Sequence, residues 1–207
     1  MDTAKQRIIE VAGPIFAQKG FHATTVREIC AAAKVNHAAI NYYFGSKENL
    51  YKEIVASISS LMALWDQESE LSPPTKGGSF EERLRELVSR RATAIFACEL
   101  SQWKIQLMIR EIHDPTPICG RSLQKTVADD YQKFHRFLDE YFAPETPDDL
   151  RWKCTFTILG TLVHYKASDW LVQELIPEAQ HQKYFQPEHI ADFVVDAFLA
   201  ASKDYRR

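Results

Sequence analysis

Residues 24–50, TTVREICAAAKVNHAAINYYFGSKENL, contain two short helical patterns separated by a brief turn. Each pattern is shorter than the ~12–15 residues at which an isolated helix becomes even marginally stable in water. Packing must therefore hold both helices, and two short helices joined in this way are typical of a helix-turn-helix. This stretch constrains the fold more than any other part of the chain.

Capping residues predict where the helices of this region begin and end. Gly20 stops a first helix in the manner of a C-terminal glycine. A capping box begins at Thr25, which a glutamate follows three residues later. Asn36 is a good N-cap for a third helix over 37–43, and Ser46 is one for a fourth helix. The fourth helix has apolar spacing over about 22 residues, which corresponds to about 33 Å.

The remainder of the chain is also predicted to be helical. Glycine is scarce, at seven residues, and apolar residues recur at helical spacing. The stretch SELSPPTKGGS, residues 69–79, breaks the fourth helix, and later helices are expected from Ser79, over roughly 99–113 and 119–142, from Thr146-Pro147 to about Trp170, and from Pro187. We predict an all-α fold of about nine helices, with a three-helix head in residues 1–46 and a larger helical domain in residues 47–207.

Composition and charge are those of an ordinary soluble globular protein. The 207 residues are 45% hydrophobic and 26% charged, and the net charge is -3. Residues 1–50 hold six Lys/Arg and four Asp/Glu, whereas residues 51–207 hold nineteen and twenty-four. The positive balance of the first part suits a segment that meets an anion.

The third helix carries polar and aromatic residues where a core helix would carry leucines. Packing on the first helix leaves His37, Ala38, Asn41 and Tyr42 on its outer side. A major groove admits one α-helix, and asparagine and histidine donate and accept hydrogen bonds at base edges. Tyrosine hydroxyls, Lys47 and the free backbone N–H groups at helix starts can bind phosphates.

The segment GFHATTVREICAAAKVNHAAINYYFGSKENLY resembles the helix-turn-helix of the tetracycline-repressor (TetR) family of bacterial transcriptional regulators. The matching features include the aromatic residue after Gly20, the Thr-Thr-x-x-x-Ile run and the spacing of Tyr42, Phe44, Lys47 and Leu50. The family usually has glycine where Lys34 stands, and a left-handed conformation costs a residue other than glycine about 1 kcal/mol. It also commonly has tyrosine at Asn41 and histidine at Tyr43.

The resemblance implies a regulator, most simply a repressor, that binds a palindromic operator in double-stranded DNA. The DNA-binding residues that we predict are Thr25, Arg27, Asn36, His37, Ala38, Asn41, Tyr42, Tyr43 and Lys47. Packing of the two tyrosines against the first helix, a solvated Lys47 and an ion-paired Arg27 are the alternatives. A homodimer through the last two predicted helices is expected, because the final helix is apolar on more than one side.

The larger domain is expected to bind a small, largely apolar effector. The candidate lining residues are Trp65, Phe96, Trp103, Met108, Phe134, Phe137, Phe156 and His164. Packing into the core is the alternative for each of them. No cofactor is implied.

Other classes of protein find less support in the sequence. The chain has no GxSxG, P-loop, dinucleotide or HExxH motif, so we do not expect an enzyme, and a helical enzyme is the alternative. A DNA-binding architectural protein would not need so large a second domain. The four cysteines form no CxxC pair, and no apolar run is long enough to span a membrane. We expect no metal site and a cytoplasmic location.

Overall fold

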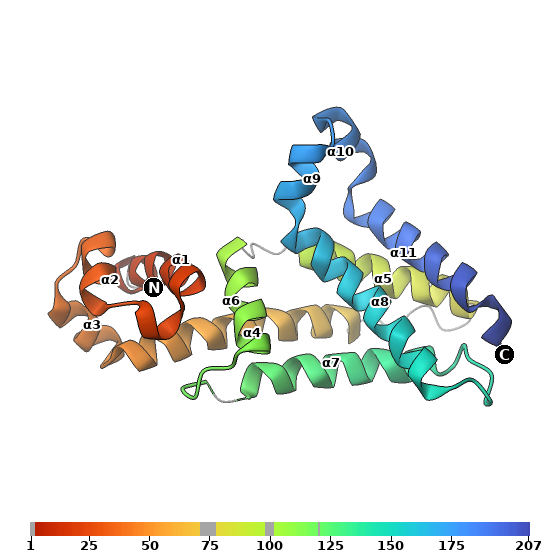
Figure 1. Cartoon of the computed structure of the whole chain (residues 1–207), viewed down its shortest axis with the longest axis horizontal. Coiled ribbons are helices and arrows are strands. Elements are labelled where there is room, and N and C mark those ends of the chain that lie inside the picture. The colour runs from red at the N-terminus through yellow and green to blue at the C-terminus, as the bar shows by residue number, and fades with distance from the viewer. Residues whose placement is uncertain (1–2, 71–77, 98–101, 120) are drawn as a thin grey trace. The chain divides into compact units, whose positions relative to one another are not determined.

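The computed structural model describes residues 3–70, 78–97, 102–119 and 121–207, and in residues 61–70 it describes the backbone alone. These residues form helices and contain no strand, which confirms the all-α prediction. They fold into eleven α-helices and one short 3₁₀ helix (Figure 1): α1 (Thr3–Ala23), α2 (Val26–Ala33), α3 (His37–Phe44), α4 (Lys47–Glu70), α5 (Phe80–Ala97), α6 (Gln102–His113), α7 (Ser122–Leu138), α8 (Asp148–Ala167), α9 (Asp169–Leu175), α10 (Glu178–Tyr184), α11 (Pro187–Ser202) and η1 (Lys203–Tyr205).

The predicted N-caps of the short helices are present. The backbone N–H of Glu28 donates to Thr25 Oγ1 over 3.2 Å, and that of Ala39 donates to Asn36 Oδ1 over 3.0 Å. Ser46 accepts from the N–H of Asn49 over 3.2 Å. Each cap satisfies one of the donors that a helix start leaves without an intrahelical partner.

The region after residue 146 differs from the prediction. The helix expected at Thr146-Pro147 begins one residue later, because the Thr146 hydroxyl donates to the carbonyl of Tyr205 over 3.3 Å and caps no helix. That helix, α8, ends at Ala167, where Ser168 leaves the helical conformation with φ -102° and ψ 14°. Two short helices that were not predicted, α9 and α10, follow.

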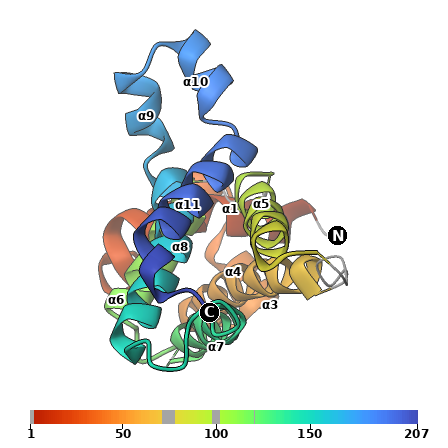
Figure 2. The same ribbon diagram turned by 90° about the vertical axis from the view of Figure 1, so that its right-hand side faces the viewer.

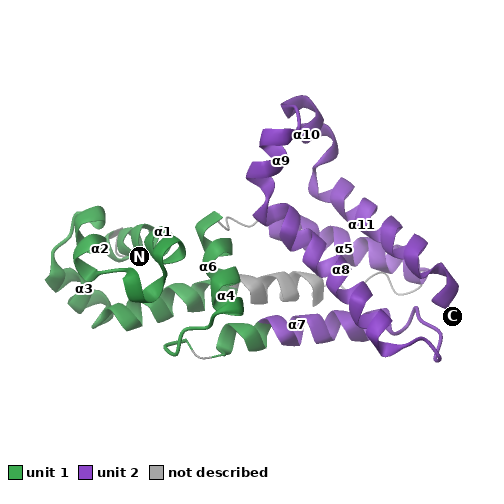
Figure 3. Cartoon of the chain, viewed as in Figure 1, with its two compact units in different colours: residues 1–62, 100–126 green, residues 63–99, 127–207 purple. Residues whose placement is uncertain are grey.

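The chain forms two compact units (Figure 3). Unit 1 consists of residues 1–62 and 100–126, and unit 2 consists of residues 63–99 and 127–207. Helix α6 therefore groups with α1–α3 and the start of α4, although residues 63–99 lie between the two segments of unit 1 in the chain. The two units are defined by which residues pack together. The predicted division at residue 46 is a different one, because it separates the segment expected to bind DNA from the rest of the chain.

Aromatic rings fill the centre of unit 1. The Phe16 and Tyr51 rings meet edge to face with centroids 4.9 Å apart, and Phe21 lies 5.2 Å from Tyr51. The Tyr51 hydroxyl donates over 2.5 Å to the buried carboxylate of Glu111. Glu111 also accepts from the N–H and the hydroxyl of Thr116, so this acid links α4, α6 and the loop after α6. Burial raises the pKa of Tyr51, and the hydrogen bond to Glu111 raises it further.

Helix α6 lies against α1 at two glycines that are seven residues apart. A Cβ atom at Gly13 would stand 2.4 Å from the Trp103 ring, so only glycine lets that ring approach the helix so closely. At Gly20, where α1 kinks with φ 80° and ψ 169°, a Cβ atom would stand 3.0 Å from the Arg110 side chain. Arg110 Nη1 donates over 3.2 Å to the carbonyl of Ala17. The two contacts fix the register between α1 and α6.

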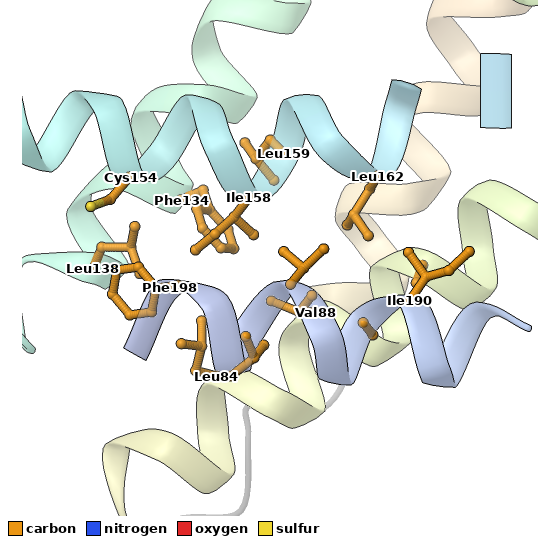
Figure 4. Close-up of a cluster of buried hydrophobic side chains, with 14 of the residues drawn as sticks. Leu84, Val88, Phe134, Leu138, Cys154, Ile158, Leu159, Leu162, Ile190 and Phe198 are labelled. Atoms are coloured by element: carbon orange, nitrogen blue, oxygen red, sulfur yellow. The ribbon is translucent and has the colours of Figure 1, made fainter. Parts of the chain in front are cut away.

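The core of unit 2 is formed by α5, α7, α8 and α11 (Figure 4). Side chains from all four helices converge, and they include Leu84, Val88, Phe134, Leu138, Ile158, Leu162, Ile190 and Phe198. Helix α11 packs along both α5 and α8. The apolar spacing that predicted these helices is therefore the spacing of their buried sides.

Helices α9 and α10 stand apart from the packed helices of unit 2 in both views (Figures 1 and 2). Each has seven residues, and neither buries any of them. Trp170, Leu175 and Tyr184 are exposed there. Within the described residues, no helix is long and apolar enough to cross a membrane.

Candidate nucleic-acid interface

The turn between α2 and α3 is built around Lys34. This residue has φ 53° and ψ 47°, the left-handed conformation that glycine adopts most easily. Its backbone N–H points at the carbonyls of Cys30 and Ala31, and the N–H of Val35 donates to Cys30 over 3.0 Å. These bonds satisfy the last carbonyls of α2 and turn the chain sharply into α3.

A side chain from α1 supports the same turn. Arg7 Nε donates over 3.1 Å to the carbonyl of Ala33, the last residue of α2. Ala33 and Ile29 are the buried residues of α2. The end of α2 is therefore stabilised by the burial of Ile29 and Ala33 and by the hydrogen bond from Arg7.

Helix α3 has two different faces. Ile40 and Phe44 are buried beneath it, whereas His37, Ala38 and Asn41 are exposed. Tyr42 is 82% exposed, so its ring does not pack on α1. Asn41 Nδ2 lies 3.3 Å from His37 Nδ1, one helical turn away, and this contact orients both polar groups on the outer face.

Tyr43 differs from its neighbour because it is half-buried. Its ring lies 5.0 Å from that of Tyr42 and 6.3 Å from that of Phe44. Tyr43 thus connects the exposed face of α3 to the buried one.

The predicted residues at the helix starts serve the fold as well. Thr25 and Asn36 are exposed, and their side-chain oxygens are the N-caps of α2 and α3. Arg27 is exposed on the first turn of α2. Beside it, the hydrogen bond and charge of Lys19 lower the pKa of the Glu28 carboxyl, so this ion pair holds α2 against α1.

Lys47 occupies a more structural position than its sequence suggests. Its ammonium donates to the carbonyls of Phe21 and Thr24 over 3.0 and 2.8 Å, and it lies 4.1 Å from the centroid of the Phe21 ring. Lys47 therefore ties the start of α4 to the junction of α1 and α2. Local sequence carries no signal for this contact, because the partners lie more than twenty residues away.

The candidate effector residues are not all in one unit. Trp103 and Met108 lie on α6 in unit 1, while Phe96, Phe134, Phe137, Phe156 and His164 belong to unit 2. Phe134 and Met108 are buried, Phe156 and His164 are exposed, and the others are half-buried. The Trp65 side chain lies outside the described residues.

Two other expectations concern metals and cysteines. Among the described residues, no group of three or more His, Cys, Asp and Glu side chains could hold a metal ion. Cys30, Cys119 and Cys154 are free thiols, and burial raises the pKa of each.

Two family models match the chain. That of the bacterial regulatory proteins of the tetR family matches residues 8–54, and that of the C-terminal domain of the HTH-type transcriptional dual regulator CecR matches residues 80–202. The second match alone spans more than half of the chain.

Curated relatives match limited stretches of the chain. CecR of Shigella flexneri is 54% identical over 50 residues, which are 24% of this chain and 22% of CecR. The repressor NicS of Pseudomonas putida is 31% identical over 93 residues, or 42% of this chain and 40% of NicS. The alignments thus span well under half of these relatives.

Solved structures share the fold along the entire chain. A TetR family transcriptional regulator from Chloroflexus aurantiacus is 15% identical, with a TM-score of 0.70, and the match covers 100% of this chain and 95% of that one. The solved structure shows the fold, and the two matched family models show that the chain belongs to the tetR family of bacterial DNA-binding transcriptional regulators.

Proposed function

We propose that this protein is a ligand-responsive repressor that reads a palindromic operator with α3. The observation that carries the proposal is the composition of the exposed face of α3, where the polar side chains of His37, Asn41 and Tyr42 are all exposed. We assign residues 1–46 to DNA binding and residues 47–207 to effector binding and dimerisation.

The test of this function is selection of random DNA duplexes on the purified full-length protein. An enriched palindrome, with half-sites about one helical turn or a multiple of it apart, is expected. Asn41→Ala and Tyr42→Ala should each weaken binding to that site by about 1–3 kcal/mol and relax specificity locally. Selection without enrichment, or two variants with unchanged affinity, would contradict the proposal.

Lys47 requires a test that separates a phosphate contact from its contacts within the fold. Two N–H groups of the Lys47 ammonium donate to the carbonyls of Phe21 and Thr24, so the third N–H is free to donate to a phosphate. Lys47→Ala should weaken binding to all sequences alike and flatten the salt dependence of affinity. A purely structural Lys47 would instead lower the melting temperature and leave the salt slope unchanged.

Dimerisation through α8 and α11 would place two copies of α3 on one operator. Support comes from apolar side chains that the protomer leaves uncovered: Phe156 on α8 is 59% exposed, and Phe193 on α11 is 63% exposed. The exposed side chains of α9 and α10 continue the apolar character of this region. Light scattering that shows a monomer at micromolar concentration, with and without DNA, would reject the dimer.

Helix α4 is the proposed carrier of the effector signal. It is a continuous helix of 24 residues, about 36 Å long, and Lys47 ties its first turn to the head. A tilt at its far end would change the spacing of two heads that must match successive major grooves. The coupling has a strict test: effector and DNA must weaken each other's binding by the same factor.

A further inference from the structure

Arg91 on α5 is a charged residue inside the core of unit 2, where it is only 6% exposed. Its Nη1 and Nη2 atoms donate to the two carboxylate oxygens of Asp130 on α7, over 3.0 and 2.6 Å. This bidentate pair fixes the plane of the guanidinium and offsets its charge. Local sequence patterns do not predict the pair, because its members are 39 residues apart.

The third nitrogen of Arg91 has no such partner. Its Nε atom is buried, and among the residues that the structure describes it is the single buried side-chain nitrogen or oxygen without a hydrogen bond. Folded proteins satisfy the large majority of buried polar side-chain atoms, so an exception calls for an explanation. The bidentate pair also prevents the Nε–H from turning toward Asp130, which leaves this donor preorganised.

The surroundings of Arg91 are aromatic. The centre of its guanidinium lies 5.7 Å from the centroid of the Phe134 ring. Tyr131, beside Asp130, is half-buried and lies with its ring 5.0 Å from that of Phe156. Burial and the Asp130 charge raise the pKa of Tyr131, so its phenol remains a neutral hydroxyl at neutral pH. Phe134 is one of the candidate effector residues identified from the sequence.

We propose that the Arg91 Nε–H is the polar anchor of the effector site and that it binds a neutral, largely apolar molecule through a carbonyl oxygen. The inference rests on the proposed function, in which the larger domain binds an effector. A neutral ligand is favoured because Asp130 already balances the guanidinium. A carboxylate ligand would bring a second negative charge close to Asp130 in surroundings that screen charge poorly.

The test uses three single-ring probes and the full-length protein labelled with nitrogen-15. Acetophenone carries a neutral carbonyl, ethylbenzene has a similar shape without oxygen, and benzoate carries a carboxylate. The Arg91 Nε–H resonance is assigned by its loss in Arg91→Lys. Acetophenone should shift this resonance and bind about tenfold or more tightly than ethylbenzene, as expected for a hydrogen bond to a charged group. Benzoate should bind more weakly than acetophenone.

A double variant separates an anchor from a merely structural ion pair. Arg91→Met with Asp130→Leu removes both charges together, so no unpaired charge is left in the core. Circular dichroism checks that its fold is retained. In this variant the advantage of acetophenone over ethylbenzene should disappear. The proposal is overturned if acetophenone leaves the wild-type Nε–H resonance unmoved at millimolar concentration, if the two neutral probes bind equally, or if benzoate binds most tightly.

These measurements involve no DNA, so their failure differs from failure of the proposed function. If the protein selects an operator but acetophenone does not shift the Arg91 Nε–H resonance, the proposed DNA-binding function stands and the proposed role of Arg91 is wrong. A protein whose Arg91 responds as expected but that selects no operator would retain the ligand site and lose the regulatory function.

Discussion

Two surfaces of this protein are exposed for different reasons. On α3, the exposed side chains include His37, Asn41 and Tyr42, whose polar groups can donate or accept hydrogen bonds. On α8 and α11, the outward residues include Phe156 and Phe193, which have no polar group. The first composition suits base edges and phosphates, whereas the second suits an apolar protein surface. Exposure by itself therefore says little about a partner until the chemistry of the exposed groups is considered.

The helix-turn-helix also differs from the exposed helices α9 and α10 in the contacts that support it. Long side chains from α1, α4 and α6 reach backbone carbonyls around the helix-turn-helix, as Arg7, Lys47 and Arg110 do. Helices α9 and α10, in contrast, bury no residue. Two short and unburied helices require further contacts to be stable.

The largest expected effect is on dimerisation, and it would show that the surface of α8 and α11 and the surface of α3 bind different partners. Phe193→Glu should weaken dimerisation at least about a hundredfold, because a twofold interface loses the burial of two phenylalanines at about 1.5–3 kcal/mol each. Sedimentation equilibrium measures this. Tyr42→Glu is the matched variant: it should leave the dimer intact and abolish operator binding. A Phe193→Glu protein that still forms dimers as the wild type does would remove the distinction drawn here.

The next effect tests the firm support of unit 1. Gly13→Ala should destabilise the protein by about 1–3 kcal/mol, because the new methyl group would collide with the Trp103 ring. Replacing Trp103 by leucine in the same protein should recover part of the loss, as thermal unfolding would show.

Gly160→Ala is the control for this substitution. Apart from its own stretch of helix, no atom of the described residues lies within 4 Å of a Cβ built at Gly160, so alanine should stabilise α8 by up to about 1 kcal/mol. This control is measured in the Phe193→Glu background, where a dimer contact at α8 cannot contribute. A Gly13→Ala protein as stable as the wild type would show that the contact between α1 and α6 is loose.

Tyr51→Phe, in the buried centre of unit 1, can be compared with Tyr42→Phe on the exposed face of α3. It leaves the buried Glu111 carboxylate without one donor and should cost about 1–3 kcal/mol at neutral pH in urea unfolding. Tyr42→Phe, on the exposed face, should change stability very little.

The pH dependence of Tyr51→Phe follows from the direction of the pKa shift. The pKa of Tyr51 is higher in the folded protein than in the unfolded chain, where it is about 10. The associated stability is therefore complete below about pH 10 and is lost as the pH rises further. The stability difference between wild type and Tyr51→Phe should narrow above pH 10, and a constant difference would contradict this assignment.

The smallest expected effect concerns the turn before α3. Lys34→Gly should stabilise the protein by about 0.5–1 kcal/mol, because it removes the strain of a left-handed lysine and is opposed by the greater freedom of glycine in the unfolded chain. Lys34→Ala retains the strain and is the control in thermal unfolding. The turn would be unstrained if Lys34→Gly were less stable than Lys34→Ala.

Much of the fold could be predicted from the sequence because the relevant interactions are local. The caps at Thr25, Asn36 and Ser46 each bond a backbone N–H three residues ahead. Apolar spacing indicated the buried side of α11. The outer face of α3 was predicted because polar and aromatic residues stand there where a core helix would carry leucines. Thr146 shows the limit of such reasoning, since its hydroxyl bonds to Tyr205 and so does not cap α8.

By itself, then, the sequence determined that the chain is helical, where α2, α3 and α4 begin and which face of α3 is polar. Only the tertiary structure decided that α6 packs on α1, that Lys47 clamps the head, and that Arg91 pairs with Asp130 and leaves its Nε without a partner. The physical reason is the range of the interactions. Helical periodicity and capping act over three or four residues, whereas Arg110 finds its carbonyl partner 93 residues away, and such a partner exists only after the chain has folded.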